Sequence, residues 1–173
     1  VYDLTKGDIS VGFNQSNQQT VTQRDGDGYV SDDKGPINGR PDDDVVITTK
    51  DDETGEVKTT DNTVTINSNE GETVNVTLEN VTINVDEGYK YGYDPDAYKT
   101  AVSVTGSGDT NIELNGNNTL TSGYGHAGLE HNKTDDSGTL TIQDEKNDDG
   151  SAKGSASDTT GSLTATGGYH GAG

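Results

Sequence analysis

Short segments in which apolar and polar residues alternate are the most regular feature of the chain. Between Val74 and Leu78 every second residue is aliphatic, and after a two-residue break the same alternation runs from Val81 to Val85. A period of two places alternate side chains on opposite faces of a strand, so that one face is buried and the other is polar. This part of the chain is therefore predicted to form two half-buried strands.

Similar short runs recur along the rest of the chain and are separated by glycine, asparagine and aspartate, which favour turns. The further runs are at 64–66, 102–104, 112–114, 119–121, 139–142 and 162–165. No stretch has the three-to-four-residue periodicity of an amphipathic helix, and the frequent threonines favour strands over helices. The pattern predicts an all-β protein.

The runs can also be aligned with one another. Segments 101–104, 111–114 and 118–121 align with segments 127–130, 139–142 and 162–165. Three short strands per repeat are typical of a parallel β-helix, in which each turn of chain buries its apolar row on the next. The predicted fold is a right-handed parallel β-helix, or solenoid. The alternative is a β-sandwich, which usually has longer strands and more aromatic residues.

The predicted repeats occupy residues 61–173, with insertions at 86–100 and 143–160. Residues 1–60 are less periodic and are expected to form an N-terminal cap with an acidic loop. No comparable cap is visible at the other end. Three explanations stay open: the chain continues in a longer protein, it ends in a short tail, or the open end receives another copy by strand addition.

The composition of the chain bears on whether it folds, on its partners and on its location. The net charge of −20 and the hydrophobic fraction of 25% are typical of disordered chains, so the periodic runs are what argue for a fold. The charge also argues against nucleic-acid binding, and no apolar run is long enough to insert into a membrane.

Absence of cysteine and methionine suits an exported bacterial protein. An extracellular or cell-surface location is expected, with a removed signal peptide as one explanation for a start at Val1.

Several glycine-rich motifs resemble a family of bacterial cell-surface β-helix proteins, often labelled carbohydrate-binding-domain-containing proteins. The resemblance covers about residues 60–173. The motifs are Asn118-Thr-Leu-Thr-Ser-Gly, Gly128-Leu-Glu-His, Gly138-Thr-Leu-Thr-Ile, and Gly161-Ser-Leu-Thr-Ala-Thr-Gly-Gly followed by Gly171-Ala-Gly. The family label implies glycan binding, but it brings no defined set of sugar-contacting residues.

A tyrosine-rich segment is the strongest candidate for a binding site. The chain has eight tyrosines and one phenylalanine, and four of these nine aromatic residues lie within residues 89–98. Tyrosine offers an apolar ring and a polar rim, which suits contact with sugars or with a protein partner, and nearby aspartates can accept hydrogen bonds from hydroxyls. The alternative is a loop that packs over the strands. The predicted ligand-binding residues are Tyr89, Tyr91, Tyr93, Asp94, Asp96 and Tyr98.

Acidic runs predict a structural calcium site. Carboxylates in neighbouring turns repel one another, and a hard cation with oxygen ligands would relieve that repulsion. The candidate ligands are Asp42, Asp43, Asp44, Asp135 and Asp136; the alternative is a solvated acidic surface.

Other chemistry has little support in the sequence. The histidines His126, His131 and His170 are expected in turns or at the surface, although His126 and His170 occupy equivalent places in successive repeats. No nucleophile elbow, phosphate loop or metal motif is present.

The predicted function is a non-enzymatic extracellular module for adhesion or glycan binding, with a glycan or a cell-surface protein as partner. One alternative is a filament subunit that joins copies of itself end to end. A second alternative is a β-helix polysaccharide lyase or hydrolase.

Overall fold

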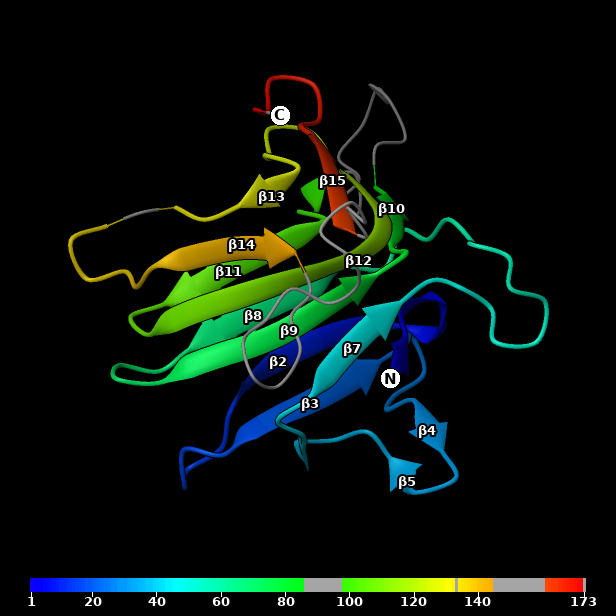
Figure 1. Ribbon diagram of the computed structural model, residues 1–173, viewed down its shortest axis with the longest axis horizontal. Coiled ribbons are helices and arrows are strands. Elements are labelled where there is room, and N and C mark those ends of the chain that lie inside the picture. The colour runs from blue at the N-terminus through cyan, green and yellow to red at the C-terminus, as the bar shows by residue number, and fades with distance from the viewer. Residues whose placement is uncertain (86–97, 133, 145–160, 173) are drawn as a thin grey trace.

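The computed structural model describes residues 1–85, 98–132, 134–144 and 161–172. Two main sheets contain most of the strands, and the ranges just given include a short 3-10 turn, η1 (Leu4–Lys6). Figure 1 shows the N-terminal strands in the lower part of the molecule and β13, β14 and β15 in the upper part. The all-β character predicted from the alternating pattern is present. No helix within these ranges is long and apolar enough to cross a membrane.

The first sheet has seven strands, and all of its pairings are parallel. The long strand β12 is its centre, because β9 and β10 pair with it from one side, and β14 and β15 from the other. Its strands are β1 (Tyr2–Asp3), β7 (Val45–Thr48), β9 (Thr73–Glu79), β10 (Thr82–Asn84), β12 (Asp109–Thr121), β14 (Leu140–Asp144) and β15 (Gly161–Thr166).

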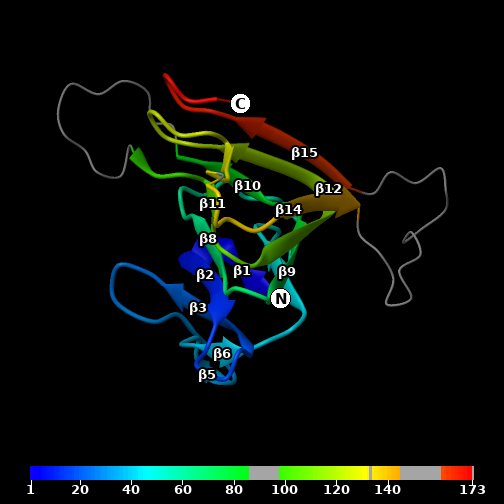
Figure 2. The ribbon, with the colours of Figure 1, turned by 90° about the vertical axis from the view of Figure 1, so that its left-hand side faces the viewer.

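The second sheet has six strands of mixed orientation, in the order β13-β11-β8-β2-β3-β6. Its strands are β2 (Asp8–Phe13), β3 (Gln19–Arg24), β6 (Arg40–Pro41), β8 (Val64–Ser68), β11 (Val102–Gly106) and β13 (Leu129–Glu130). A third, two-stranded sheet joins β4 (Ser31–Asp32) to β5 (Gly35–Pro36). The two main sheets face each other across the core, as the side view in Figure 2 shows.

The predicted right-handed parallel β-helix is wrong, because the described strands form several sheets of mixed orientation. Strand β3 runs antiparallel to both β2 and β6, and β4 runs antiparallel to β5. The physical cause is the tight turn between β2 and β3. The Asn14 side chain accepts hydrogen bonds from the backbone N–H groups of Ser16 and Gln18, and Asn17 adopts a left-handed φ of 53° that reverses the chain.

In the central strands, the aliphatic residues that the alternation assigned to the inner face are buried. In β8 and β9, Val64, Ile66, Val74, Val76 and Leu78 have at most 1% of their surface exposed. The same is true of Ile83 in β10. Most of the polar neighbours are exposed or half-buried, although Ser68 and Thr77 are buried. The core lies between the two main sheets, where these aliphatic rows stack from strand to strand.

The aligned segments are neighbours in the structure, but in a different register. Leu129 lies opposite Val102, and Ile142 lies opposite Ile112. These pairings differ by one or two residues from the sequence alignment. A slip of one residue exchanges the two faces of a strand, so register decides which side chains are buried.

Burial decreases in the strands nearest the C-terminus. Ile112 in β12 is fully buried, whereas Ile142 opposite it in β14 is 41% exposed. Leu129, Leu140 and Leu163 are likewise only partly buried against the core. In the part of the chain that the structure describes, β13, β14 and β15 form the last row, and their apolar side chains are partly uncovered.

The small β4–β5 sheet is held to the rest of the chain by Arg40. Its guanidinium donates to both carboxylate oxygens of Asp32, at 2.8 Å for Nη2 to Oδ1, and to the backbone oxygen of Gly35 at 2.8 Å. The side-chain hydrogen bond from Arg40 lowers the pKa of Asp32 from 3.8 to about 2. A pKa lowered by folding contributes stability that is complete above about pH 4 and is lost as the pH falls towards 2.

We therefore expect an Arg40→Met variant to be less stable than the wild type above pH 4. The gap between the two should narrow as the pH falls from about 4 to 2, because Asp32 becomes protonated in both proteins. Thermal unfolding of the two proteins across this pH range measures the gap. A gap that stays constant down to pH 2 would show that the ion pair does not stabilise the fold.

Candidate functional site

Three turns near the C-terminal end lie against one another and carry most of the described tyrosines. The turns contain residues 98–100, 122–128 and 167–172. The backbone N–H of Gly123 donates to the carbonyl oxygen of Lys99 at 2.8 Å, and that of Gly125 donates to Tyr169 at 2.9 Å. Each turn is thereby joined to the next.

Ser122 strengthens the first of these junctions from inside the protein. Its fully buried hydroxyl accepts a hydrogen bond from the backbone N–H of Ala101 at 2.8 Å and donates to the carbonyl oxygen of Ala127 at 2.6 Å. Both partners are backbone groups, so the hydroxyl holds the middle turn and the preceding turn in one arrangement.

Four aromatic side chains gather on these turns, and we call Tyr98, Tyr124, Tyr169 and His170 the aromatic cluster. The Tyr124 ring is central: its centroid is 5.5 Å from that of Tyr98, 5.8 Å from that of Tyr169 and 5.6 Å from that of His170. These separations are those of favourable aromatic pairs. Tyr98 is 42% exposed and Tyr169 is 62% exposed. The cluster is thus an ordered aromatic surface that faces solvent.

Glycines make this close stacking possible. A Cβ atom added to Gly168 would lie 2.1 Å from the carbonyl oxygen of Gly123, and one added to Gly171 would lie 1.9 Å from that of His126. Between them, His170 adopts a left-handed φ of 65°, which costs a residue with a side chain about 1–2 kcal/mol. The turn maintains this unfavourable conformation and thereby presents the imidazole beside Tyr169, with ring centroids 4.3 Å apart.

A hydrogen-bonded pair lies beside the aromatic cluster. His126 Nδ1 and Glu130 Oε2 are 2.8 Å apart, and Asn132 Nδ2 donates to the other Glu130 oxygen at 2.9 Å. Partial burial opposes ionisation of Glu130, but the hydrogen bond and the charge of His126 outweigh it and lower the pKa of the carboxyl group. Glu130 is therefore an ionised acceptor at neutral pH.

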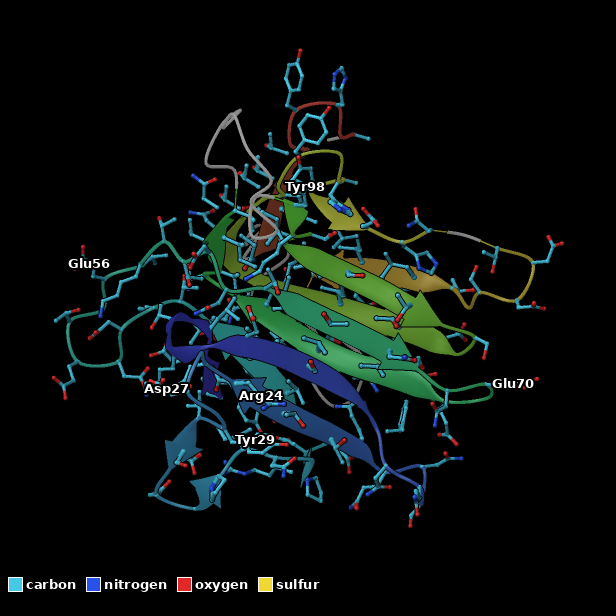
Figure 3. The ribbon with its side chains drawn as sticks, turned by 180° about the vertical axis from the view of Figure 1, so that it is seen from behind. Arg24, Asp27, Tyr29, Glu56, Glu70 and Tyr98 are labelled. Atoms are coloured by element: carbon cyan, nitrogen blue, oxygen red, sulfur yellow. The ribbon has the colours of Figure 1, made fainter. Side chains whose placement is uncertain are left out.

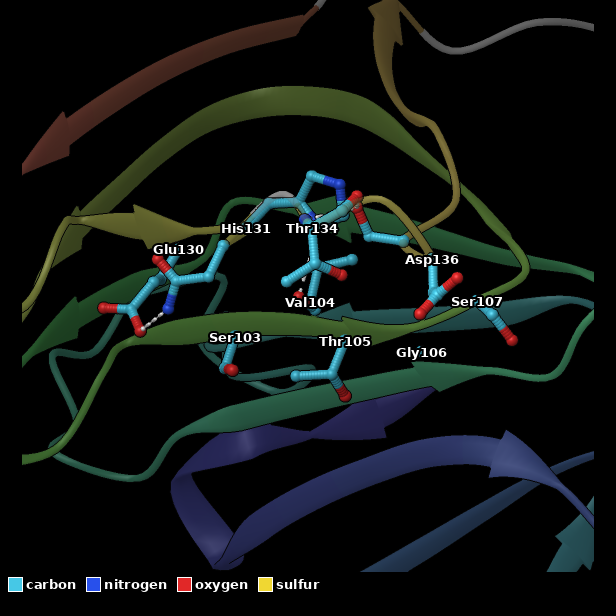
Figure 4. Close-up of a pocket in the computed structure, with 11 residues that line it drawn as sticks. Ser103, Val104, Thr105, Gly106, Ser107, Glu130, His131, Thr134 and Asp136 are labelled. Carbon is cyan, nitrogen blue, oxygen red and sulfur yellow. Dashed lines mark hydrogen bonds between the residues drawn. The ribbon is translucent and has the colours of Figure 1, made fainter.

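A groove of about 360 Å³ runs along β11, where the two-residue strand β13 ends and the chain leaves the sheet. Figure 4 shows Glu130 at one end of this groove, and Asp136 and Ser107 at the other. Ser103 and Thr105 of β11 line one side. The ring of His131 spans the gap, with Nδ1 3.3 Å from the carbonyl oxygen of Val104 and Nε2 3.2 Å from that of Gly138. The lining thus combines hydroxyls, carboxylates and an imidazole.

Only one of the predicted ligand-binding residues is described, and it lies in the aromatic cluster. Tyr98 packs edge to face on Tyr124 and is exposed in the upper part of the protein, above the second sheet (Figure 3). Tyr89, Tyr91, Tyr93, Asp94 and Asp96 lie outside the described residues.

The acidic runs do not converge into a cation site in the part of the chain that is described. No group of three or more histidine, aspartate or glutamate side chains suited to a metal occurs there. Asp42 accepts a hydrogen bond from the Tyr2 hydroxyl at 2.8 Å, and its Oδ1 accepts one from the backbone N–H of Asp44. Burial of Tyr2 and this hydrogen bond raise the pKa of the phenol. The calcium site stays a prediction.

Tyr124 and Tyr169 are the functional candidates that the sequence reasoning missed. Each follows a glycine in a glycine-rich turn, within Gly123-Tyr-Gly-His and Gly168-Tyr-His-Gly. The expectation that His126 and His170 lie in neighbouring turns is confirmed, since the His126 carbonyl oxygen accepts a hydrogen bond from Gly168. Tyr124 lies two residues before His126 and Tyr169 lies one residue before His170, so the same correspondence would have brought both tyrosines into the cluster.

Comparison with family models, with curated proteins and with solved structures found no match for the chain.

Proposed function

We propose that this protein is a non-enzymatic, extracellular glycan-binding or adhesion module, and that the aromatic cluster is its contact surface. The observation that carries the proposal is the assembly of Tyr98, Tyr124, Tyr169 and His170 into one exposed, internally packed surface. Exposed aromatic patches on a strongly charged protein are unusual and are typical of binding sites.

The chemistry of the cluster suits a sugar ring. A tyrosine ring offers an apolar face for the C–H groups of a pyranose, while its hydroxyl remains available for hydrogen bonds. The rings are held in place by packing on one another and by the hydrogen-bonded turns below them. Little side-chain entropy is therefore lost on binding, and preorganised surfaces of this kind bind more tightly than flexible ones.

Screening on a glycan array tests the proposal, with Tyr124→Ala as the disabling variant. We expect the wild-type protein to bind at least one class of glycan and the variant to bind about tenfold more weakly or not at all, because the central ring contacts the three others. Tyr29→Ala is the matched control. Tyr29 is 43% exposed, packs on Arg24, and lies far from Tyr98 in Figure 3.

The array also gives a clear contrary result. Equal binding by wild type and Tyr124→Ala would assign recognition to another surface. Loss of binding in both Tyr124→Ala and Tyr29→Ala would point to a general loss of folding, which circular dichroism of both variants measures separately.

Self-association is a second candidate, and the partly uncovered last row of strands favours it. Leu140, Ile142 and Leu163 present apolar surface on β14 and β15, which among the described strands pair only with β12, so that another copy could add a strand there. At the opposite end, the buried amide of Gln19 bonds to the backbone of Asp42 and Asn75 and so pairs part of the edge of β9. The exposed apolar side chains favour contact between two copies through their β14 edges.

A further inference from the structure

We infer that the groove along β11 continues the glycan site of the aromatic cluster, so that the protein binds an oligosaccharide chain without acidic groups rather than a single sugar. The inference rests on the proposed function and extends it to the length and charge of the ligand. Three observations support it: the groove lies next to the aromatic cluster, polar side chains line the groove, and Glu130 connects the two.

The link is Glu130. Its carboxylate contacts His126 at 2.8 Å, in the turn that carries Tyr124, and the same residue lines the near end of the groove. Tyr98 also lies only a few residues before β11, whose Ser103 and Thr105 line the groove. The cluster and the groove are thus successive parts of one surface.

The size and lining of the groove suit a sugar residue. Pockets that hold small ligands usually enclose about 300–1,000 Å³, and this groove of about 360 Å³ lies at the lower end of that range. The hydroxyls of Ser103 and Ser107 and the carboxylates of Glu130 and Asp136 can pair with the hydroxyls of a sugar. A chain bound at the aromatic cluster could extend past Glu130 and along β11 to these groups.

The charged side chains described in the groove disfavour acidic chains. The two carboxylates of the groove belong to a protein of net charge −20, and Glu130 is ionised at neutral pH because its pKa is lowered. A uronic-acid chain would meet like charges at short range, which is costly in a partly buried groove. Uncharged or amine-bearing chains avoid this repulsion.

The experiment uses the full chain and arrays of glucans, mannans, xylans, chito-oligosaccharides and oligogalacturonates, each printed in several lengths. Ser103→Leu fills the groove from the exposed face of β11. Ser10→Leu is the matched control. Ser10 of β2 pairs with Thr65 of β8, and Thr65 pairs with Ser103 of β11, so that Ser10 and Ser103 lie in one row across the second sheet. Both substitutions place the same side chain on the outer face of the second sheet, where Ser103 is half-buried and Ser10 is exposed.

We expect wild-type affinity to rise with the length of a non-acidic chain. Ser103→Leu should lower the affinity for long chains about tenfold and leave the affinity for the shortest chain unchanged. Ser10→Leu should change neither affinity. Equal binding of short and long chains, or equal effects of the two leucine variants, would overturn the inference while leaving the Tyr124 result intact. Preference for oligogalacturonates would overturn the charge argument. Binding to no glycan at all would overturn the proposed function itself.

Discussion

Replacement of Ile112 with alanine is expected to lower the free energy of unfolding by about 2–5 kcal/mol. Ile112 is fully buried in β12 and pairs with Val76 of β9 on one side and with Ile142 of β14 on the other. Truncation removes apolar contacts on both sides and leaves a cavity that the rigid strands cannot close. Urea unfolding of wild type and variant measures the loss.

Ile142→Ala is the matched control, because the same side chain is truncated one strand further along. Ile142 is 41% exposed, so we expect a loss below about 1.5 kcal/mol. Similar losses for the two variants would mean that the last row of strands is covered in solution. Analytical ultracentrifugation would then show whether a second copy covers it.

Gly108→Ala is expected to lower the free energy of unfolding by about 3 kcal/mol. A Cβ atom there would lie 1.9 Å from the backbone oxygen of Asn69 and 2.6 Å from that of Glu72, so the turn between β8 and β9 would have to move. The neighbouring turn has the same requirement, because a Cβ on Gly138 would lie 1.9 Å from the Gly108 oxygen. Thermal unfolding measures the effect.

Gly26→Ala provides the comparison for this prediction. A Cβ at Gly26 would meet no atom within 4 Å, and its backbone is not left-handed. We expect a change within about 1 kcal/mol in either direction. If Gly108→Ala were tolerated as well as Gly26→Ala, the close contact between turns would not be what holds these strands in register.

The core could be predicted from the sequence because alternation depends only on which residues are apolar. A strand has a period of two whatever its partner, so Val74, Val76 and Leu78 were correctly assigned to the buried face. The orientation of the partner is not encoded in that period. The reversal between β2 and β3 depends on the side-chain hydrogen bonds of Asn14 and the left-handed backbone of Asn17, which the alternating pattern does not contain.

The candidate site was only partly predictable for a related reason. A local concentration of tyrosines drew attention to residues 89–98, of which the structure describes Tyr98 alone. Tyr124 and Tyr169 are isolated in the sequence and meet only because their turns hydrogen bond to each other. A cluster assembled from three separate turns has no compositional signal, and in the sequence only the correspondence between the turns of His126 and His170 points to it.

Nuclear magnetic resonance of the tyrosine side chains during titration with the best glycan from the array tests the central claim most directly. The account predicts that the ring signals of Tyr98, Tyr124 and Tyr169 shift together and saturate with one affinity, while those of Tyr2 and Tyr29 stay unchanged. Saturable binding that leaves the three cluster rings unshifted would contradict it.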